Sequence, residues 1–209
     1  MRKLPRQARA LATTDAIRDA AAHVLGERGW QGLTTNTVAE AAGVSIGSLY
    51  QYFPNKLALI EAVRRRHFDD ILLVLRNASD KTMPRERRIA ALVEGMIAIH
   101  SRYPAAHHAL LNECPRGEDS RRTHDFFAKE WRKSYEAVFA ANARRAGDQS
   151  GIGASLLAGA LAGAVHEAAR RGTLDSPVMK QELLTMVDAY LARRQTVELP
   201  EPATTQARR

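Results

Sequence analysis

Residues 34–56 have the sequence TTNTVAEAAGVSIGSLYQYFPNK, and this stretch decides the fold of the chain. Thr34 is a suitable N-cap for a first short helix, because its hydroxyl can accept a hydrogen bond from an unpaired backbone N–H. Gly43 predicts a tight turn after this helix, since glycine adopts a positive φ at little cost. Ser45 can cap a second short helix, and Pro54 ends it because proline disfavours helix at the preceding residue.

The second helix has a surface suited to the DNA major groove, where a recognition helix lies in helix-turn-helix proteins. Its inward positions are predicted to be Leu49, Tyr52 and Phe53. Serine and glutamine at the other positions can hydrogen-bond base edges, and isoleucine can contact a thymine methyl group. Tyrosines and Lys56 offer donors of the kind that hold phosphates. A helical hairpin inside a core would not explain so many polar residues on so short a helix.

This stretch resembles the DNA-binding motif of the TetR (tetracycline-repressor) family of bacterial transcriptional regulators. The shared pattern is T-T-x-x-V-A-x-x-A-G-V-S-x-G-S-L-Y-x-Y-F-P-N-K, which extends over all 23 residues. The resemblance implies contacts to the DNA backbone from Thr35, Tyr50, Tyr52 and Lys56. It also implies that bases are faced by Asn36, Ile46, Gly47, Ser48 and Gln51. The expected DNA-binding set is completed by Thr37 and Ser45.

A further helix is predicted before the motif, capped by Thr13 or Thr14 and ended by Gly29. Its apolar residues recur with helical spacing at Ile17, Ala20, Ala21, Val24 and Leu25. Trp30 and Leu33 follow it and are expected to pack under the helix-turn-helix. Residues 1–12 are basic, with Arg2, Lys3, Arg6 and Arg9. They form either a frayed tail or an arm that contacts phosphates.

The composition bounds the class of protein. The chain has 209 residues, of which 45% are hydrophobic, and a net charge of +8 that favours an anionic partner such as nucleic acid or a membrane surface. No signal peptide is recognisable at the N-terminus. The longest apolar stretch, residues 154–165, is shorter than the roughly 20 residues that span a bilayer, so a cytoplasmic protein is expected. The single cysteine, Cys114, is expected to be a buried small residue rather than a redox sensor.

Helical periodicity continues through the rest of the chain, and no apolar–polar alternation is long enough for a strand. The predicted fold class is all-α, with about nine helices. After the motif, helices are expected at residues 56–77, 86–103, 104–113, 119–145, 154–171 and 177–194. Leu57 and Phe126 are placed on inward faces. The run from Arg64 to Arg66 is expected to be a solvated face rather than a further DNA contact.

The resemblance implies an N-terminal three-helix DNA-binding domain and a C-terminal helical domain for ligand binding and dimerisation. The expected boundaries are a helix-turn-helix domain at 13–56 with its motif at 34–53, an effector-binding and dimerisation domain at 57–195, and a disordered tail at 196–209. In the family, the last two long helices pair with their copies in a second subunit. A homodimer through residues 154–171 and 177–194 is therefore expected, and burial of these helices within one chain is the alternative.

The C-terminal domain has no recognisable ligand motif, and a pocket between its helices is the expected effector site. The residues predicted to line it are Met96, His100, Tyr103, Phe127, Trp131, Tyr135 and His166, with His107, His108 and Glu113 as further candidates. Adjacent histidines on a helix project about 100° apart, which suits a shared metal ion poorly. No metal and no cofactor are therefore expected.

The predicted function is a ligand-responsive repressor that a small molecule releases from a palindromic DNA operator. The alternatives are a helical enzyme and a helical module that binds a protein or a membrane surface. The sequence has no Gly-rich phosphate loop, no GxSxG and no HExxH, which disfavours an enzyme. Neither alternative needs the pattern at residues 34–56.

Overall fold

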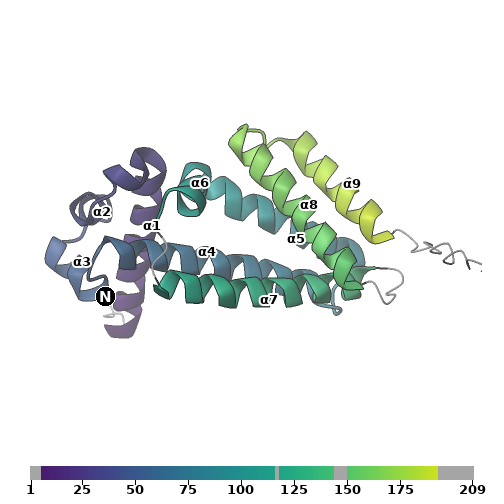
Figure 1. The fold of residues 1–209 in the computed structure, drawn as a ribbon, viewed down its shortest axis with the longest axis horizontal. Helices are drawn as coiled ribbons and strands as arrows, with labels where there is room; N and C mark the ends of the chain where they lie inside the picture. Colours follow the sequence, from purple (N-terminus) through teal and green to yellow (C-terminus); the bar gives the residue numbers. More distant parts are fainter. Residues whose placement is uncertain (1–5, 116–117, 144–149, 193–209) are drawn as a thin grey trace, which may run out of the picture.

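The computed structural model of the chain describes residues 6–115, 118–143 and 150–192. These residues form nine helices and no strand, so the predicted all-α fold class is confirmed (Figure 1). The helices are α1 (Arg6–Gly32), α2 (Thr35–Ala41), α3 (Ile46–Tyr52), α4 (Lys56–Ser79), α5 (Arg85–Arg102), α6 (Pro104–Asn112), α7 (Glu118–Asn142), α8 (Ser150–Arg170) and α9 (Pro177–Ala192). The predicted tail at 196–209 lies outside the described residues.

The start of α1 differs from the prediction. The helix begins at Arg6, and the hydroxyls of Thr13 and Thr14 donate to the carbonyls of Arg9 and Ala10 one turn earlier. The two threonines are therefore inside the helix and do not cap it, because their side chains bond backward along the helix. Residues 1–5 of the predicted basic arm lie outside the described residues. The helical turn does break at Gly29, where φ is 63°.

Most other helix starts follow their capping residues. Thr34 and Thr37 form a reciprocal capping box at α2, and the Ser45 hydroxyl accepts from the backbone N–H of Ser48 at α3. The side chain of Asn55 accepts from the N–H of Ala58 at 2.9 Å, which fixes the start of α4. The turn glycine Gly43 has a φ of 66°. The helix-turn-helix geometry is thus specified by bonds within the predicted stretch.

The helices enclose two separate hydrophobic cores. The head core lies among α1, α2, α3 and the first turns of α4, and it also takes Ala106, Ala109 and Leu110 from α6. The body core lies among α4, α5, α7, α8 and α9 and begins on α4 at Ile71. In Figure 1 the head is at the left, and α4 extends from it into the body beside α7. A single continuous helix therefore connects the two cores.

Three residues predicted to face inward are exposed instead. The exposed fractions are 36% for Tyr52, 50% for Leu57 and 63% for Phe126. Two of them lie next to a residue that takes the inward position: Phe53 is buried beside Tyr52, and Phe127 stacks on Phe68 with ring centroids 3.9 Å apart. Because neighbouring helical residues project about 100° apart, burying one residue of such a pair turns the other outward.

The arginine run on α4 was predicted to be a solvated face, and this is wrong for two of its three members. Arg64 is buried, and its guanidinium contacts Glu61 on its own helix and the Ser120 hydroxyl on α7. Arg66 pairs with Asp19 of α1 at 3.1 Å. Arg65 is exposed, as expected. Two arginines of the run therefore attach α4 to neighbouring helices.

The apolar helix α8 is longer than its sequence suggested. It begins at Ser150, so residues 150–153 of the predicted loop are helical. Among the described residues it is the one helix, over Gly151–Arg170, that is long and apolar enough to cross a membrane by composition. The prediction that this apolar stretch is too short to span a bilayer therefore does not hold. One side of α8, however, is buried in the body core at Leu157, Leu161 and Val165. It is a core helix of the fold.

Candidate DNA-binding and effector sites

The outward face of the helix-turn-helix carries most of the residues predicted to meet DNA. Asn36, Ser45, Ile46, Gly47, Tyr50, Gln51 and Tyr52 are exposed, and Thr35, Thr37, Ser48 and Lys56 are half-buried. The inward residue of α3 is Leu49, which is fully buried in the head core. The short helix α3 is thus held by one apolar anchor while its remaining side chains face solvent.

Several of these polar groups also serve the fold. The Ser45 and Ser48 hydroxyls lie 2.8 Å apart, and the Thr37 hydroxyl donates to the Thr34 carbonyl at 2.9 Å. Across the two helices, the Thr35 hydroxyl and the Tyr50 hydroxyl form a hydrogen bond of 3.1 Å. This last contact orders two predicted phosphate-binding groups relative to each other. Asn36 and Gln51, by contrast, make no side-chain hydrogen bond to any residue that the structure describes.

Lys56 lies in a setting that the sequence did not reveal. Its ammonium group donates to the Trp30 carbonyl at 2.5 Å and lies 3.8 Å from the centroid of the Trp30 ring. The ammonium group of Lys56, in the first turn of α4, therefore interacts with α1 through both the carbonyl and the ring of Trp30. A phosphate at this position would compete with, or add to, an existing contact between the two helices.

Most of the predicted effector residues meet in one cavity of about 170 Å³ between α4, α5, α7 and α8. Six of the seven line it: Met96, His100, Phe127, Trp131, Tyr135 and His166. The seventh, Tyr103, lines a different cavity because it lies just past the end of α5. The additional candidates His108 and Glu113 line neither of these cavities but an open groove near α1 and α8.

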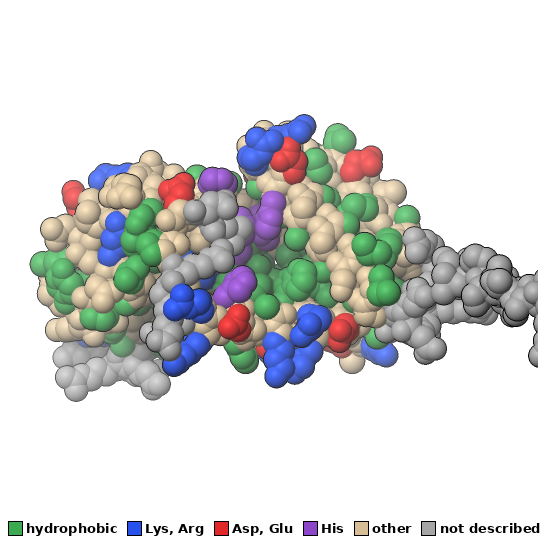
Figure 2. Space-filling model, in the orientation of Figure 1, with side chains coloured by type: hydrophobic (Ala, Val, Ile, Leu, Met, Phe, Trp, Pro, Cys, Tyr) green, Lys and Arg blue, Asp and Glu red, His purple; other side chains and the backbone are tan. Residues whose placement is uncertain are grey.

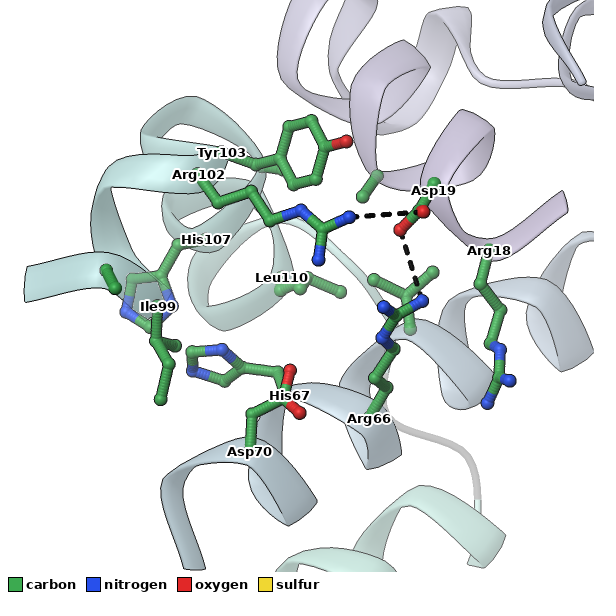
Figure 3. A pocket seen from close by; sticks show the side chains of 14 residues that line it. Arg18, Asp19, Arg66, His67, Asp70, Ile99, Arg102, Tyr103, His107 and Leu110 are labelled. Atoms are coloured by element: carbon green, nitrogen blue, oxygen red, sulfur yellow. Dashed lines mark hydrogen bonds and ion pairs between the residues drawn. The ribbon is translucent and has the colours of Figure 1, made fainter. Parts of the chain in front are cut away.

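The second cavity, of about 340 Å³, lies between α1, α4, α5 and α6 and is charged (Figure 3). Arg66 and Arg102 both contact the carboxylate of Asp19, each at 3.1 Å. Asp70 lines the same cavity, and burial raises the pKa of its carboxyl group. Figure 3 shows His67 from α4 and His107 from α6 on one side of this space.

Four histidines from four helices meet where the two cavities adjoin. We call His67, His100, His107 and His166 the histidine cluster; they come from α4, α5, α6 and α8. The ring centroids of His107 lie 4.6 Å from those of His67 and His100 and 4.7 Å from that of His166. The sequence prediction named three of these residues as separate candidates but missed His67 and the cluster itself. The only hint was the helical register of His100, which places it on the buried stripe of α5.

The rings of the histidine cluster are neutral at pH 7. Desolvation by burial, together with repulsion from neighbouring histidines, lowers the pKa of His67 to about 3, of His100 to about 4 and of His107 to about 2. Burial also lowers the pKa of His166. Neutral imidazoles have one free acceptor nitrogen each, which is the form that binds metal ions.

Cys114, which follows α6, is buried at the head core, as predicted. Burial raises the pKa of its thiol to about 11, although Arg64 and Lys56 act in the opposite direction. A thiol with so high a pKa stays protonated and is a poor nucleophile. A redox role is therefore not supported.

Residues 17–63 match the family described as bacterial regulatory proteins, tetR family. The matched segment contains α2, the glycine turn and α3, together with the parts of α1 and α4 that form the head core. The chain belongs to the TetR family. The predicted resemblance is therefore confirmed.

Two curated relatives in the family and one solved structure show how far the likeness extends. The chain is 39% identical over 75 residues to the transcriptional activator FasR of Mycolicibacterium smegmatis, which covers 36% of this chain and 34% of FasR. It is 32% identical over 87 residues to the repressor KstR2 of Rhodococcus jostii, covering 40% of this chain and 43% of KstR2. The chain thus matches less than half of the length of these relatives. The SmeT–triclosan complex has the same fold, with a TM-score of 0.62, 22% identity and coverage of 91% and 99% of the two chains.

Membership of the TetR family decides against one alternative that the sequence left open, the helical enzyme. The family consists of non-enzymatic regulators, so the chain is not expected to catalyse a reaction. Its members bind DNA operators and small-molecule effectors. The two relatives differ in mode, since one is named an activator and the other a repressor.

Proposed function

We propose that the chain is a cytoplasmic, ligand-responsive repressor that binds a two-fold-symmetric DNA operator as a homodimer. The observation that carries this proposal is the outward face of α3, where Ile46, Gly47 and Gln51 are exposed on a helix anchored by Leu49. Such a helix fits the major groove, where small and uncharged side chains reach base edges. The net charge of +8 adds general attraction to DNA.

A homodimer is supported by an exposed apolar strip on α8 and α9, which the described parts of the chain leave uncovered. The exposed fractions are 62% for Ile152, 57% for Leu156 and 72% for Val178. On the same helix α8, a Cβ atom added at Gly159 or Gly163 would meet nothing within 4 Å, so another helix could approach closely. Exposed apolar surface of this kind marks an interface, and a two-fold interface of identical patches would bring two heads to one operator.

We expect Leu156→Glu to weaken dimerisation at least about tenfold, because a charge would be buried at the centre of the apolar strip without a partner. Leu156 is exposed in the single chain, so the fold of each subunit should be unchanged. Sedimentation velocity at several protein concentrations measures the effect. Ala140→Glu, which adds the same charge on the exposed side of α7, is the control. Equal dimerisation of the two variants would contradict the proposed interface.

The mode of regulation follows from the connection between head and body. The cavity of about 170 Å³ contacts α4 through His67, Phe68 and Ile71, and the same helix begins beside α3. A small molecule that favours one position of α4 would change the separation of the two heads. Ligand and DNA would then oppose each other through one conformational equilibrium, which is the behaviour of an inducible repressor.

Selection of bound fragments from the parent genome with purified protein tests the proposed function directly. A regulator should enrich a few sites with two-fold symmetry, with half-sites about 34 Å apart or a multiple of that distance. Recovery of fragments without a shared sequence would contradict specific regulation. The alternative of a protein-binding or membrane-surface module predicts no preference for any duplex.

The selected operator then allows a test of base reading by Gln51. Gln51→Ala should change the preferred base at one position of each half-site, because a good side-chain contact to a base is worth about 1–3 kcal/mol of discrimination. Tyr50→Ala should instead weaken binding to every site without changing the preference. Gel-shift titrations with single-base operator variants separate the two effects. If the Gln51→Ala protein ranks these variants as the native protein does, Gln51 does not read a base.

A further inference from the structure

The histidine cluster has the composition and spacing of a metal site. The ligand nitrogens of His67, His100 and His107 all lie within 4.8 Å of one another, and Nε2 of His107 lies 3.0 Å from Nε2 of His166. A tetrahedral zinc ion with Zn–N bonds of about 2.0–2.1 Å holds its ligand nitrogens about 3.3–3.4 Å apart. Three of the rings therefore hold nitrogens within 4.8 Å of one another, the fourth ring contacts His107, and one ion would have to draw the four nitrogens closer by side-chain rotation.

The hydrogen bonds of the rings show which nitrogens are available to an ion. Nδ1 of His100 donates to the Met96 carbonyl at 2.7 Å, which leaves Nε2 of the neutral ring as the bare nitrogen. A backbone carbonyl that orients the ring in this way is the usual outer partner of a metal-binding histidine. In the His107 ring, Nδ1 is buried without a hydrogen-bond partner among the described residues, while Nε2 lies next to His166. One ring offers one nitrogen to one ion, so Nε2 is the His107 ligand in a four-histidine site and Nδ1 is its outer nitrogen.

We propose that His67, His100, His107 and His166 form a binding site for one divalent first-row transition metal ion of the zinc class. Imidazole nitrogens suit zinc, copper, iron and nickel, and the absence of oxygen ligands from the four-ring set disfavours calcium and magnesium. The apolar residues around the rings, such as Phe68 and Val165, exclude water and leave the imidazoles as the ligands. Figure 2 shows histidine side chains gathered at the hollow between the head and the body.

The position of the site gives it a regulatory consequence. On α4, His67 lies between Val63, the last residue of the head core, and Ile71, the first of the body core. On α6, His107 faces the cluster while Ala106 packs against α1, where a Cβ atom at Gly26 would lie 3.2 Å from the Ala106 nitrogen. An ion that draws the four rings together would thus fix α6, and with it α1, relative to the body. Occupancy should therefore change DNA affinity, and this second step rests on the proposed function.

The site itself is tested without DNA. Full-length protein stripped of metal with a chelator is titrated with Zn²⁺ by calorimetry, and with Co²⁺ as a probe whose visible absorption reports tetrahedral coordination. One equivalent per chain should bind and should raise the melting temperature. His100→Ala and His166→Gln should each weaken Zn²⁺ binding more than about 100-fold, because losing a ligand costs more than losing an outer partner.

Matched controls make the test decisive. His108→Ala changes the neighbour of His107 in the sequence. The ring of His108 lies outside the cluster, with its Nδ1 3.8 Å from the Glu113 carboxylate. The His108→Ala protein should therefore bind Zn²⁺ as the native protein does. His100 is buried and its variant could lose its fold, so circular dichroism of the metal-free proteins is compared, and the half-buried His166 provides the second variant. Absence of stoichiometric binding, or equal losses in His108→Ala and His166→Gln, would overturn the site.

The regulatory step is measured separately on the selected operator, with and without one equivalent of Zn²⁺. A change of at least about tenfold in DNA affinity, absent from His166→Gln, supports it. Unchanged DNA affinity in a protein that binds Zn²⁺ would overturn the regulatory step and leave the metal site standing. Failure of all DNA binding, with Zn²⁺ binding intact, would overturn the proposed function instead.

Discussion

Gly47→Glu is expected to leave the fold intact and to lower operator affinity at least about 100-fold, equivalent to about 2.7 kcal/mol. Gly47 is exposed on α3, and a Cβ atom there would meet only the Ser45 hydroxyl at 3.9 Å. The site therefore has room for a side chain in the free protein. A glutamate near the N-terminus of a helix is also favourable for the helix dipole, so the free energy of unfolding should not fall.

The loss arises only when DNA is present. A glutamate at this position would enter the major groove beside the side chains of Ile46 and Ser48. It would hold the backbone of α3 away from the base edges and bring a negative charge close to the phosphates. Like charges placed in contact at an interface cost several kcal/mol. Both effects act at each head of a dimer, so each half-site of the operator loses binding free energy.

Two controls separate sterics and charge from folding. Gly47→Ala adds one methyl group and should weaken binding far less than the glutamate. Ala140→Glu adds the same charge on the exposed side of α7, away from the head, and should alter affinity only slightly. Fluorescence anisotropy on the selected operator, with melting curves for each protein, gives both quantities. Native affinity of the Gly47→Glu protein would show that α3 does not enter the groove.

The helix-turn-helix could be predicted from the sequence because local bonds determine it. Thr34, Gly43, Ser45 and Asn55 each fix a helix end through their own side chain or φ angle, and these contacts join residues only a few positions apart. The predicted start of α1 was wrong for a related reason. Thr13 and Thr14 are residues of the type that caps helices, but α1 begins before them. Their hydroxyls therefore donate to carbonyls of the preceding turn.

The body sites could be predicted only in part. Six of the effector residues share a cavity because they lie on buried stripes whose helical period is visible in the sequence. Tyr103 lies elsewhere because α5 ends before it. The histidine cluster requires four helices to meet at one level, and His67 is far from His166 in the sequence. No local pattern encodes that meeting, since it depends on how the helices pack.

The attachment of α4 to the body also depends on packing, and Arg64→Ala tests it. We expect this variant to lose about 3–5 kcal/mol of unfolding free energy, which is the usual cost of removing one partner of a buried ion pair. Arg64 is 5% exposed, and its Nη1 lies 2.8 Å from Glu61 Oε2 and 2.7 Å from the Ser120 hydroxyl. The other oxygen of Glu61 is already buried, and no described residue forms a hydrogen bond with it. Without Arg64, the whole carboxylate would lack a neutralising charge.

Urea unfolding of Arg64→Ala, with the exposed neighbour Arg65→Ala as control, measures this cost. Arg65→Ala removes the same charge and should stay within about 0.5 kcal/mol of the native protein. The double variant Glu61→Ala/Arg64→Ala should recover part of the loss, because it removes the carboxylate that Arg64 neutralised. A loss below about 1 kcal/mol for Arg64→Ala would contradict a structural role for the pair. A full loss with no recovery in the double variant would instead assign the cost to the other Arg64 contacts. These are with the Leu110 carbonyl of α6, at 3.5 Å, and with the Ser120 hydroxyl of α7.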